Sequence, residues 1–148
     1  MDKPIALVTG TSRGIGKAIV LKLAEQGFYV IGTEINDELT AKIGEYLQEA
    51  GLEGEGRTLD VTDQEAVEEV LKAITSEVGV PTVLVNNAGI TRDNLLMRMK
   101  DDEWGSVIET NLSSVYRMSK ACLRGMMKAK TGRIINIASV VGLSGNAG

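Results

Sequence analysis

The chain alternates between short, wholly apolar runs and longer stretches in which apolar side chains recur at helical spacing. Ile5 to Val8 form an apolar run that stops before Gly10, as expected for a strand buried on both faces. From Ile15 to Gln26 apolar residues recur every four positions, which predicts a helix packed on a sheet and ended by Gly27. The same rhythm predicts further strands at 28–33, 57–61, 82–85 and 133–138, and a long helix over much of 111–130.

Polar residues and glycines mark the boundaries of these elements. Asp37 is predicted to cap a helix that ends at Gly51. Gly54 to Gly56 are predicted to form a turn before the third strand. Thr62 and Glu65 have the spacing of a capping box, which predicts the start of the next helix.

Five strands separated by helices indicate repeated βαβ units. Because such crossovers are right-handed, the fold class is α/β: a Rossmann-like doubly wound parallel sheet in three α/β/α layers. Residues 1–148 read as one domain that is incomplete at its C-terminus, since a sheet of this kind usually carries a sixth strand. The isolated chain is expected to be marginally stable, with an unpaired edge on its last strand.

Composition excludes several classes of protein. With 16 Lys and Arg against 20 Asp and Glu, the net charge of −4 argues against a nucleic-acid binder. The chain has no His and one Cys, so no metal site or internal disulfide is predicted. No apolar run reaches the roughly 20 residues that cross a bilayer, and the N-terminus lacks a secretion signal. The expected location is the cytoplasm, with no membrane partner.

The glycine-rich segment after the first strand is the clearest candidate for a binding site. Gly10 permits the tight exit from the strand, Gly14 lets the backbone approach a diphosphate, and Gly16 lets the helix pack closely. The N–H groups at the start of the helix then face the phosphates. A glycine-rich turn without a ligand is the alternative, but its place at a strand-to-helix junction favours a nucleotide. The segment also contains Thr11, Ser12, Arg13 and Ile15.

The Gly-x-x-x-Gly-x-Gly spacing of this segment resembles the short-chain dehydrogenase/reductase family. The resemblance extends over essentially the whole chain. Asp60-Val61 falls where the family contacts adenine, and Asn86-Asn87-Ala88-Gly89 resembles its Asn-Asn-Ala-Gly signature. Asn111 and Ser139 fall where the family places two of its four catalytic residues. The stretch 89–99 is similar to reductases of 3-oxoacyl chains held on acyl carrier protein.

The resemblance implies reduction of 3-oxoacyl-ACP to 3-hydroxyacyl-ACP in fatty-acid biosynthesis, by hydride transfer. It implies that Ser139 holds the carbonyl, that Asn111 supports a water relay, and that a Tyr-x-x-x-Lys pair lies beyond Gly148. The 148 residues alone are therefore expected to be inactive. Two alternatives stay open: a nucleotide-binding protein without turnover, and an oxidoreductase of acetoacetyl-CoA or another short-chain ketone.

Two features point to different cofactors. Arg13 lies where the family meets the 2′-phosphate of NADP(H), and the subfamily resemblance also implies NADP(H). Glu34 and Ile35 argue against NADP(H). NAD-preferring relatives carry an acid such as Glu34 after the second strand, and reductases of this type often have a Thr at the position of Ile35. The prediction is NADP(H), with NAD(H) left open because of Glu34.

A Tyr-x-x-x-Lys spacing also occurs at Tyr116 and Lys120, but it precedes Ser139. It is predicted to be a pair on a helix surface. Cys122 is predicted to be a small packing residue without redox function. Trp104 and the methionines nearby are predicted to serve the core or subunit contacts, and the resemblance implies a homotetramer. These methionines are Met97, Met99, Met118, Met126 and Met127.

Basic residues cluster around the end of the long helix, at Arg124, Lys128, Lys130 and Arg133. They offer a docking surface for an acidic acyl carrier protein through complementary charge. The alternative is a cationic helix end favoured by the helix dipole.

Overall fold

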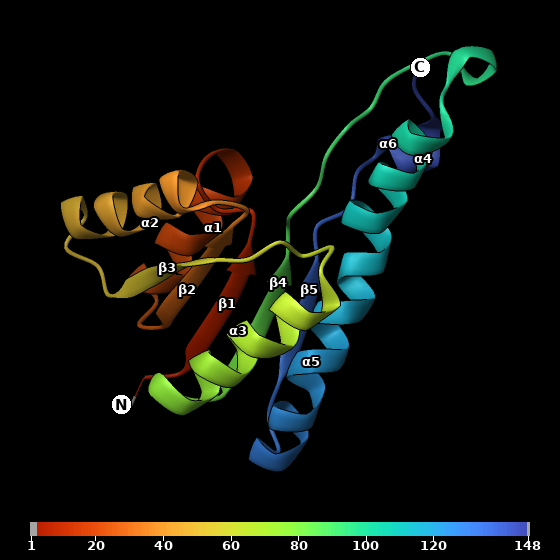
Figure 1. Ribbon diagram of the computed structural model, residues 1–148. Helices are drawn as coiled ribbons and strands as arrows, with labels where there is room; N and C mark the ends of the chain where they lie inside the picture. The colour runs from red at the N-terminus through yellow and green to blue at the C-terminus, as the bar shows by residue number, and fades with distance from the viewer. Residues whose placement is uncertain (1–2, 148) are drawn as a thin grey trace.

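The computed structural model describes residues 3–147 and contains the alternating strands and helices that the hydrophobic pattern predicts (Figure 1). The strands are β1 (Ile5–Thr9), β2 (Tyr29–Glu34), β3 (Gly54–Thr58), β4 (Pro81–Asn86) and β5 (Arg133–Asn136). The α-helices are α1 (Gly14–Glu25), α2 (Asp37–Glu49), α3 (Gln64–Glu77), α4 (Asp101–Ile108), α5 (Ser114–Ala129) and α6 (Val141–Ser144).

The strands form one parallel sheet in the order β3-β2-β1-β4-β5. From β1 the chain builds outward to β3 and then crosses to the other side of β1 to form β4. The direction of winding therefore changes between β1 and β4, which is the switch point of a doubly wound sheet. The Rossmann-like α/β prediction is confirmed.

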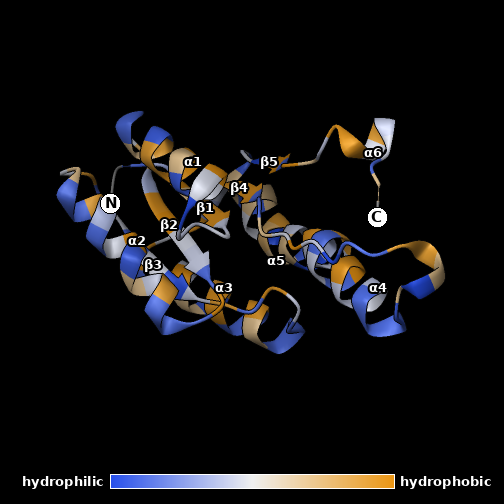
Figure 2. Ribbon diagram, turned by 90° about the horizontal axis from the view of Figure 1, so that it is seen from above, coloured by the Kyte–Doolittle hydropathy of each residue, from blue (hydrophilic) through white to orange (hydrophobic). Residues whose placement is uncertain are grey.

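The helices cover both faces of the sheet, as the view from above shows (Figure 2). On one face α1 and α2 pack on β1, β2 and β4 through a buried cluster that includes Val8, Val20 and Ile43. On the other face α3 and α5 pack through a second cluster that includes Leu7 and Met118, both fully buried. Residues from both faces of β1 are buried, as its unbroken apolar run predicted.

Two predicted helix caps are one residue away from the observed ones. Asn36, not Asp37, caps α2: its side-chain oxygen accepts from the N–H of Leu39 at 2.9 Å, and Asp37 becomes the first helical residue. Asp63 caps α3, while Thr62 donates to Asp60 instead. In both cases two adjacent polar residues could each serve as the N-cap, and the sequence spacing alone did not show which of them does so.

The predicted turn at Gly54–Gly56 is wrong, because these glycines lie inside β3. A Cβ atom at Gly54 would lie 2.3 Å from the carbonyl oxygen of Val30, and one at Gly56 would lie 2.5 Å from that of Thr40. Glycine is required here by the close approach of β2 and α2, and not by a turn. Asp60 and Val61 consequently lie beyond the end of β3.

The long helix predicted within 111–130 belongs to a longer helical run. A 3₁₀ turn, Leu96–Arg98, precedes α4, and a π-helical turn at Glu109–Ser113 joins α4 to α5. Helix α5 packs on the sheet, whereas α4 and α6 lie beyond its edge (Figure 1). Strand β5 ends at Asn136, two residues earlier than predicted. Within residues 3–147, no helix has both the length and the apolar character that a membrane span requires.

Candidate functional site

The predicted nucleotide-binding residues gather at one edge of the sheet, where the parallel strands end. Residues 10–16, here called the phosphate loop, follow β1, and Glu34 and Ile35 stand at the end of β2. Asp60 and Val61 follow β3, and Asn87 to Gly89 follow β4. Ligands of doubly wound sheets bind outside the carboxyl ends of the strands at the switch point, which here lies between β1 and β4.

Each glycine of the phosphate loop meets a different steric demand. Gly10 has φ +69°, and a Cβ there would lie 2.9 Å from the Cα of Ala88. A Cβ at Gly16 would lie 2.0 Å from the carbonyl oxygen of Gly10. Gly14 has φ +58°, but no atom lies within 4 Å of its missing Cβ, so its backbone faces open space. Gly10 and Gly16 close the loop, and Gly14 leaves its outer surface accessible to a ligand.

The start of α1 differs from the starts of α2 and α3. Its N-cap residue, Arg13, makes no side-chain cap, and its first turn contains no acidic residue. By contrast Asn36 caps α2 and Asp63 caps α3, each followed by acidic residues. Within residues 3–147, no side chain accepts from the first amides of α1, and together with the open surface at Gly14 these amides fit the diphosphate of a dinucleotide.

The Asn-Asn-Ala-Gly segment fastens β4 to the phosphate loop. The side-chain amide of Asn87 donates to the carbonyl oxygens of Thr9 and Gly10 at 3.0 and 2.8 Å. In return the Thr9 hydroxyl oxygen accepts from the N–H groups of Asn87 and Ala88 at 3.1 and 3.0 Å. These four bonds hold the two sides of the switch point in a fixed relation. Sequence reasoning did not identify Thr9, because a Thr at a strand end carries no signal of this role.

Tyr46 of α2 also contacts the phosphate loop. Its hydroxyl donates to the carbonyl oxygen of Thr11 at 3.0 Å, and the ammonium of Lys17 lies 4.8 Å from the centre of its ring. Burial raises the pKa of Tyr46 to about 12, so the hydroxyl keeps its proton. Tyr46 was not identified from the sequence, because nothing in the sequence separates it from the core residues Ile43 and Leu47 that are buried beside it on α2.

At the adenosine side of the edge, the carboxylate of Glu34 accepts from the N–H of Ser12 at 2.9 Å. The neighbouring Ile35 is 60% exposed. Asp60 accepts from the N–H and the hydroxyl of Thr62, and Val61 is buried. These side chains surround the end of β2, where an adenosine moiety lies in folds of this class.

Asn111 and Ser139 lie on the β4–β5 side of this edge. Asn111 belongs to the π-helical turn; its side chain accepts from the N–H of Ile90 and donates to the carbonyl oxygen of Ile90, both at 2.8 Å. Ser139 follows β5, and its hydroxyl oxygen accepts from the N–H of Val141 at 3.3 Å. That bond leaves the hydroxyl proton of Ser139 able to donate to a substrate oxygen.

The second Tyr-x-x-x-Lys pair lies on the exposed face of α5, where the Lys120 ammonium donates to the Tyr116 hydroxyl at 3.3 Å. Cys122 is buried, and burial raises the pKa of its thiol to about 12, which suits a packing role. Of the residues predicted to serve the core or subunit contacts, Met118 and Met126 are buried. Met97, Trp104 and Met127 are exposed, so for these three the subunit-contact half of the prediction remains.

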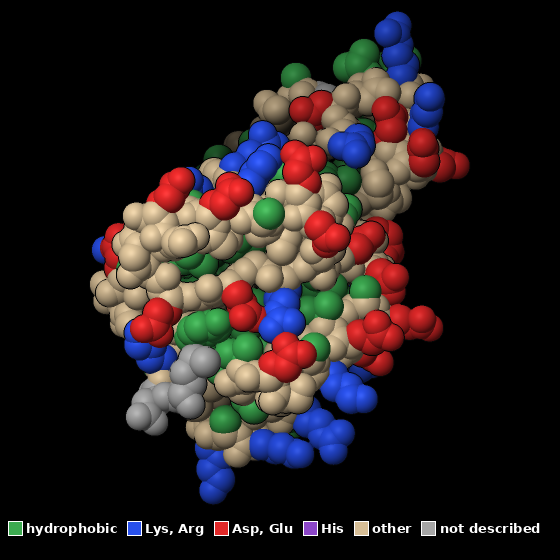
Figure 3. Space-filling model, turned by 60° about the vertical axis from the view of Figure 1, so that its left-hand side comes forward, with side chains coloured by type: hydrophobic (Ala, Val, Ile, Leu, Met, Phe, Trp, Pro, Cys, Tyr) green, Lys and Arg blue, Asp and Glu red, His purple; other side chains and the backbone are tan. Residues whose placement is uncertain are grey.

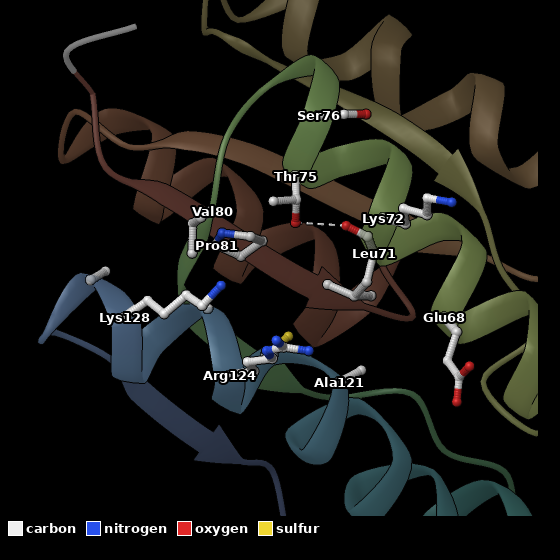
Figure 4. A pocket seen from close by; sticks show the side chains of 13 residues that line it. Glu68, Leu71, Lys72, Thr75, Ser76, Val80, Pro81, Ala121, Arg124 and Lys128 are labelled. Atoms are coloured by element: carbon white, nitrogen blue, oxygen red, sulfur yellow. Dashed lines mark hydrogen bonds between the residues drawn. The ribbon is translucent and has the colours of Figure 1, made fainter.

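A groove of about 910 Å³ lies between α3 and α5, beside the start of β4. Arg124 and Lys128 line it, facing Val80 and Pro81 (Figure 4). Lys and Arg side chains also gather at the end of the molecule where α5 ends (Figure 3). The groove contains none of the predicted nucleotide or catalytic residues. Among the described residues, no three His, Cys, Asp or Glu side chains gather where they could hold a metal ion.

Comparison with known proteins agrees with this geometry. The chain is 60% identical over all 148 residues to the 3-oxoacyl-[acyl-carrier-protein] reductase FabG of Vibrio harveyi, and 59% identical to that of Vibrio cholerae. It is 58% identical over 144 residues to the FabG of Escherichia coli, which covers 97% of the chain. The chain spans about 59% of the length of these curated relatives.

The sequence model described as short chain dehydrogenase matches residues 4–148, which include the phosphate loop, the Asn-Asn-Ala-Gly segment, Asn111 and Ser139. Membership of this family implies a nicotinamide cofactor, which fits the uncapped start of α1 and the open surface at Gly14. The chain belongs to the short chain dehydrogenase family.

Proposed function

We propose that the protein reduces 3-oxoacyl chains carried on acyl carrier protein to 3-hydroxyacyl chains, as a step of fatty-acid biosynthesis. The observation that carries the proposal is the identity of about 60% to FabG reductases over the entire chain. The phosphate loop, tied to β4 by Asn87, supplies the matching geometry.

The phosphate loop and the start of α1 bind the diphosphate of the cofactor through backbone N–H groups. When bound, the dinucleotide supplies the hydride. Tyr46 and Asn87 fix the carbonyl groups of the loop, so the amides are preorganised before the cofactor arrives. The resemblance implied NADP(H), with NAD(H) left open because of Glu34, and the geometry of Glu34 bears directly on that choice.

Ser139 and Asn111 are the proposed catalytic residues of this chain. The Ser139 hydroxyl donates to the substrate carbonyl oxygen, which becomes more negative as the ketone is reduced. Asn111 holds the backbone of Ile90 in place and supports a water relay. The resemblance places the proton-donating Tyr and its Lys beyond Gly148, and Tyr116 is not proposed for that role.

Ser139→Ala in the full-length protein tests this assignment. We expect kcat for an acetoacetyl substrate to fall about 10²- to 10³-fold, while dinucleotide binding stays unchanged, because Ser139 acts on the developing oxyanion. Tyr116→Phe is the matched control and should leave kcat nearly intact. A full-length protein that binds a dinucleotide but reduces no 3-oxo substrate would instead support the binding-protein alternative.

Acyl carrier protein is the proposed partner, and the basic cluster around the end of α5 is its proposed docking surface. Arg124 and Lys128 line the groove beside α3, and Lys130 follows the helix in a left-handed conformation, with φ 54°. Lys128→Glu together with Lys130→Glu should raise KM for the carrier-linked substrate more than for acetoacetyl-CoA. Equal effects on both substrates would remove the docking surface and favour the CoA-linked alternative.

We also propose that the full-length protein is a homotetramer and that it is located in the cytoplasm. Several apolar side chains on the π-helical turn and α5 are exposed, and they suit a contact between subunits. They are Leu112, Tyr116, Leu123 and Met127. Sedimentation of the full-length protein measures the oligomeric state directly.

A further inference from the structure

Glu34 closes the adenosine side of the phosphate loop. It is the last residue of β2 and is only partly exposed. One carboxylate oxygen accepts from the N–H of Ser12 at 2.9 Å, and the other accepts from the N–H of Ile35 at 3.3 Å. The carboxylate is therefore held against the phosphate loop by two backbone donors.

From this geometry we infer that the protein selects NADH over NADPH, and that Glu34 determines the choice. The inference rests on the proposed function, because it assumes that a nicotinamide dinucleotide occupies this edge of the sheet. An acid in this position accepts a hydrogen bond from the ribose 2′-hydroxyl of NADH. The 2′-phosphate of NADPH offers a charge near −2 and no comparable donor, so the carboxylate repels it.

The neighbours of Glu34 do not compensate for this repulsion. The N–H of Ser12, a donor that a phosphate at this position would need, is already bonded to Glu34. Ile35, the next side chain along the chain, is 60% exposed and apolar, so it can donate nothing. A 2′-phosphate would have to displace the Glu34 carboxylate before it could accept from either of these backbone N–H groups.

Arg13 is the one feature that favours the phosphate. It stands at the N-cap of α1 with an extended backbone and is exposed, and within residues 3–147 its side chain forms no ion pair. Its single positive charge faces two negative groups when NADPH binds, Glu34 and the phosphate. Because exposed cations are screened by water and salt, one arginine does not offset a fixed carboxylate bonded to the loop.

The experiment measures equilibrium dissociation constants of NADH and NADPH for the full-length protein, from the fluorescence of the reduced nicotinamide without any substrate. We expect NADH to bind at least about tenfold more tightly than NADPH. In Glu34→Gln, which keeps the size of the side chain and removes its charge, NADPH should gain about tenfold and the preference should disappear. Glu38→Gln is the matched control: it removes the same charge from an exposed site on α2 and should leave the ratio unchanged.

Adenosine 2′,5′-bisphosphate and AMP provide a second measurement without the nicotinamide. The bisphosphate should compete poorly against NADH in the wild-type protein and well in Glu34→Gln. Tighter binding of NADPH by the wild-type protein, or an equal shift in Glu38→Gln, would overturn the selection by Glu34 while the proposed reductase stands. Binding of neither dinucleotide would overturn both.

Discussion

Two regions of this molecule are packed very differently, although both belong to one parallel sheet. In β1 every residue is buried, Leu7 fully so, and Ile31 and Ile43 on the neighbouring elements are also fully buried. In β5 all four residues are exposed, and α4 and α6 contain no buried residue. Within the 148 residues, the proposed nucleotide side (the phosphate loop and the sheet around β1) is held by its own core. The proposed substrate side (the 3₁₀ turn, α4, β5 and α6) leaves apolar side chains such as Leu96 and Leu143 in contact with solvent.

The difference separates the two tasks of the proposed enzyme. A dinucleotide needs backbone amides fixed before it binds, and the phosphate loop meets this need through bonds from Asn87 to Gly10 and from Tyr46 to Thr11. Within residues 3–147, the side chain of Ser139 bonds only to its own turn, and that of Asn111 bonds only to Ile90. We expect nucleotide binding to tolerate local changes near β5, and chemistry on the substrate to depend on further contacts there.

The difference in burial between β1 and β5 gives the largest expected effect, which is on the free energy of unfolding. Leu7→Ala removes a fully buried side chain from the centre of the sheet and should lower the free energy of unfolding by about 2–5 kcal/mol. Ile135→Ala, at a position of β5 that is 46% exposed, should lower it by less than about 1 kcal/mol when both variants are made in the 148-residue chain. Urea denaturation followed by circular dichroism measures both. Equal losses would show that β5 is packed as firmly as β1.

Gly16 and Gly44 test how tightly the phosphate loop is packed, because a single added Cβ atom would meet a backbone atom at Gly16 and nothing at Gly44. Gly16→Ala should destabilise the protein by about 3 kcal/mol and abolish dinucleotide binding, because the new Cβ would overlap the Gly10 carbonyl oxygen. Gly44→Ala is the matched control on α2, where nothing lies within 4 Å, and should stabilise the helix by about 0.5–1 kcal/mol. Thermal unfolding with and without NADH measures both. Opposite signs are the expected result, and a tolerated Gly16→Ala would contradict the closed loop.

The same contrast explains what could be predicted from the sequence. The apolar run of β1 and the helical spacing that follows it fixed the α/β class, because burial on both faces leaves a clear pattern. Gly54 and Gly56 misled the prediction, since a glycine needed for close packing cannot be distinguished from one needed for a turn. The π-helical turn around Asn111 has no sequence pattern at all.

Side-chain partners were the least predictable part of the site. The glycine loop and Glu34 were found by their positions after strands, which a linear sequence does record. Tyr46 reaches Thr11 across 35 positions, and Asn87 reaches Gly10 across 77. Such contacts depend on the packing of helix on sheet and of strand on strand, so neither the spacing nor the residue type revealed them.

The smallest expected effect lies in the helical run beyond the sheet, and it depends on pH. Glu109 begins the π-helical turn, and the guanidinium of Arg117 bonds its carboxylate, with the Ser113 hydroxyl as a second donor at 3.1 Å. These bonds hold the pKa of Glu109 below its usual value of 4.5. Glu103 is similar, since the N–H of Lys100 lowers the pKa of its carboxyl.

A carboxyl whose pKa is lower in the folded state stabilises that state above pH about 4.5, and this contribution disappears as the pH falls through the lowered pKa. Hydrogen exchange of the amides at 103–117 should therefore accelerate, relative to intrinsic rates, below pH about 4.5, while the amides of β1 stay protected. In Glu109→Gln the acceleration should shrink, because the titrating group is gone while Glu103 remains. An equal acid response in β1 would show that the two regions open together, and the contrast between a self-supporting nucleotide side and a weakly held substrate side would then have to be abandoned.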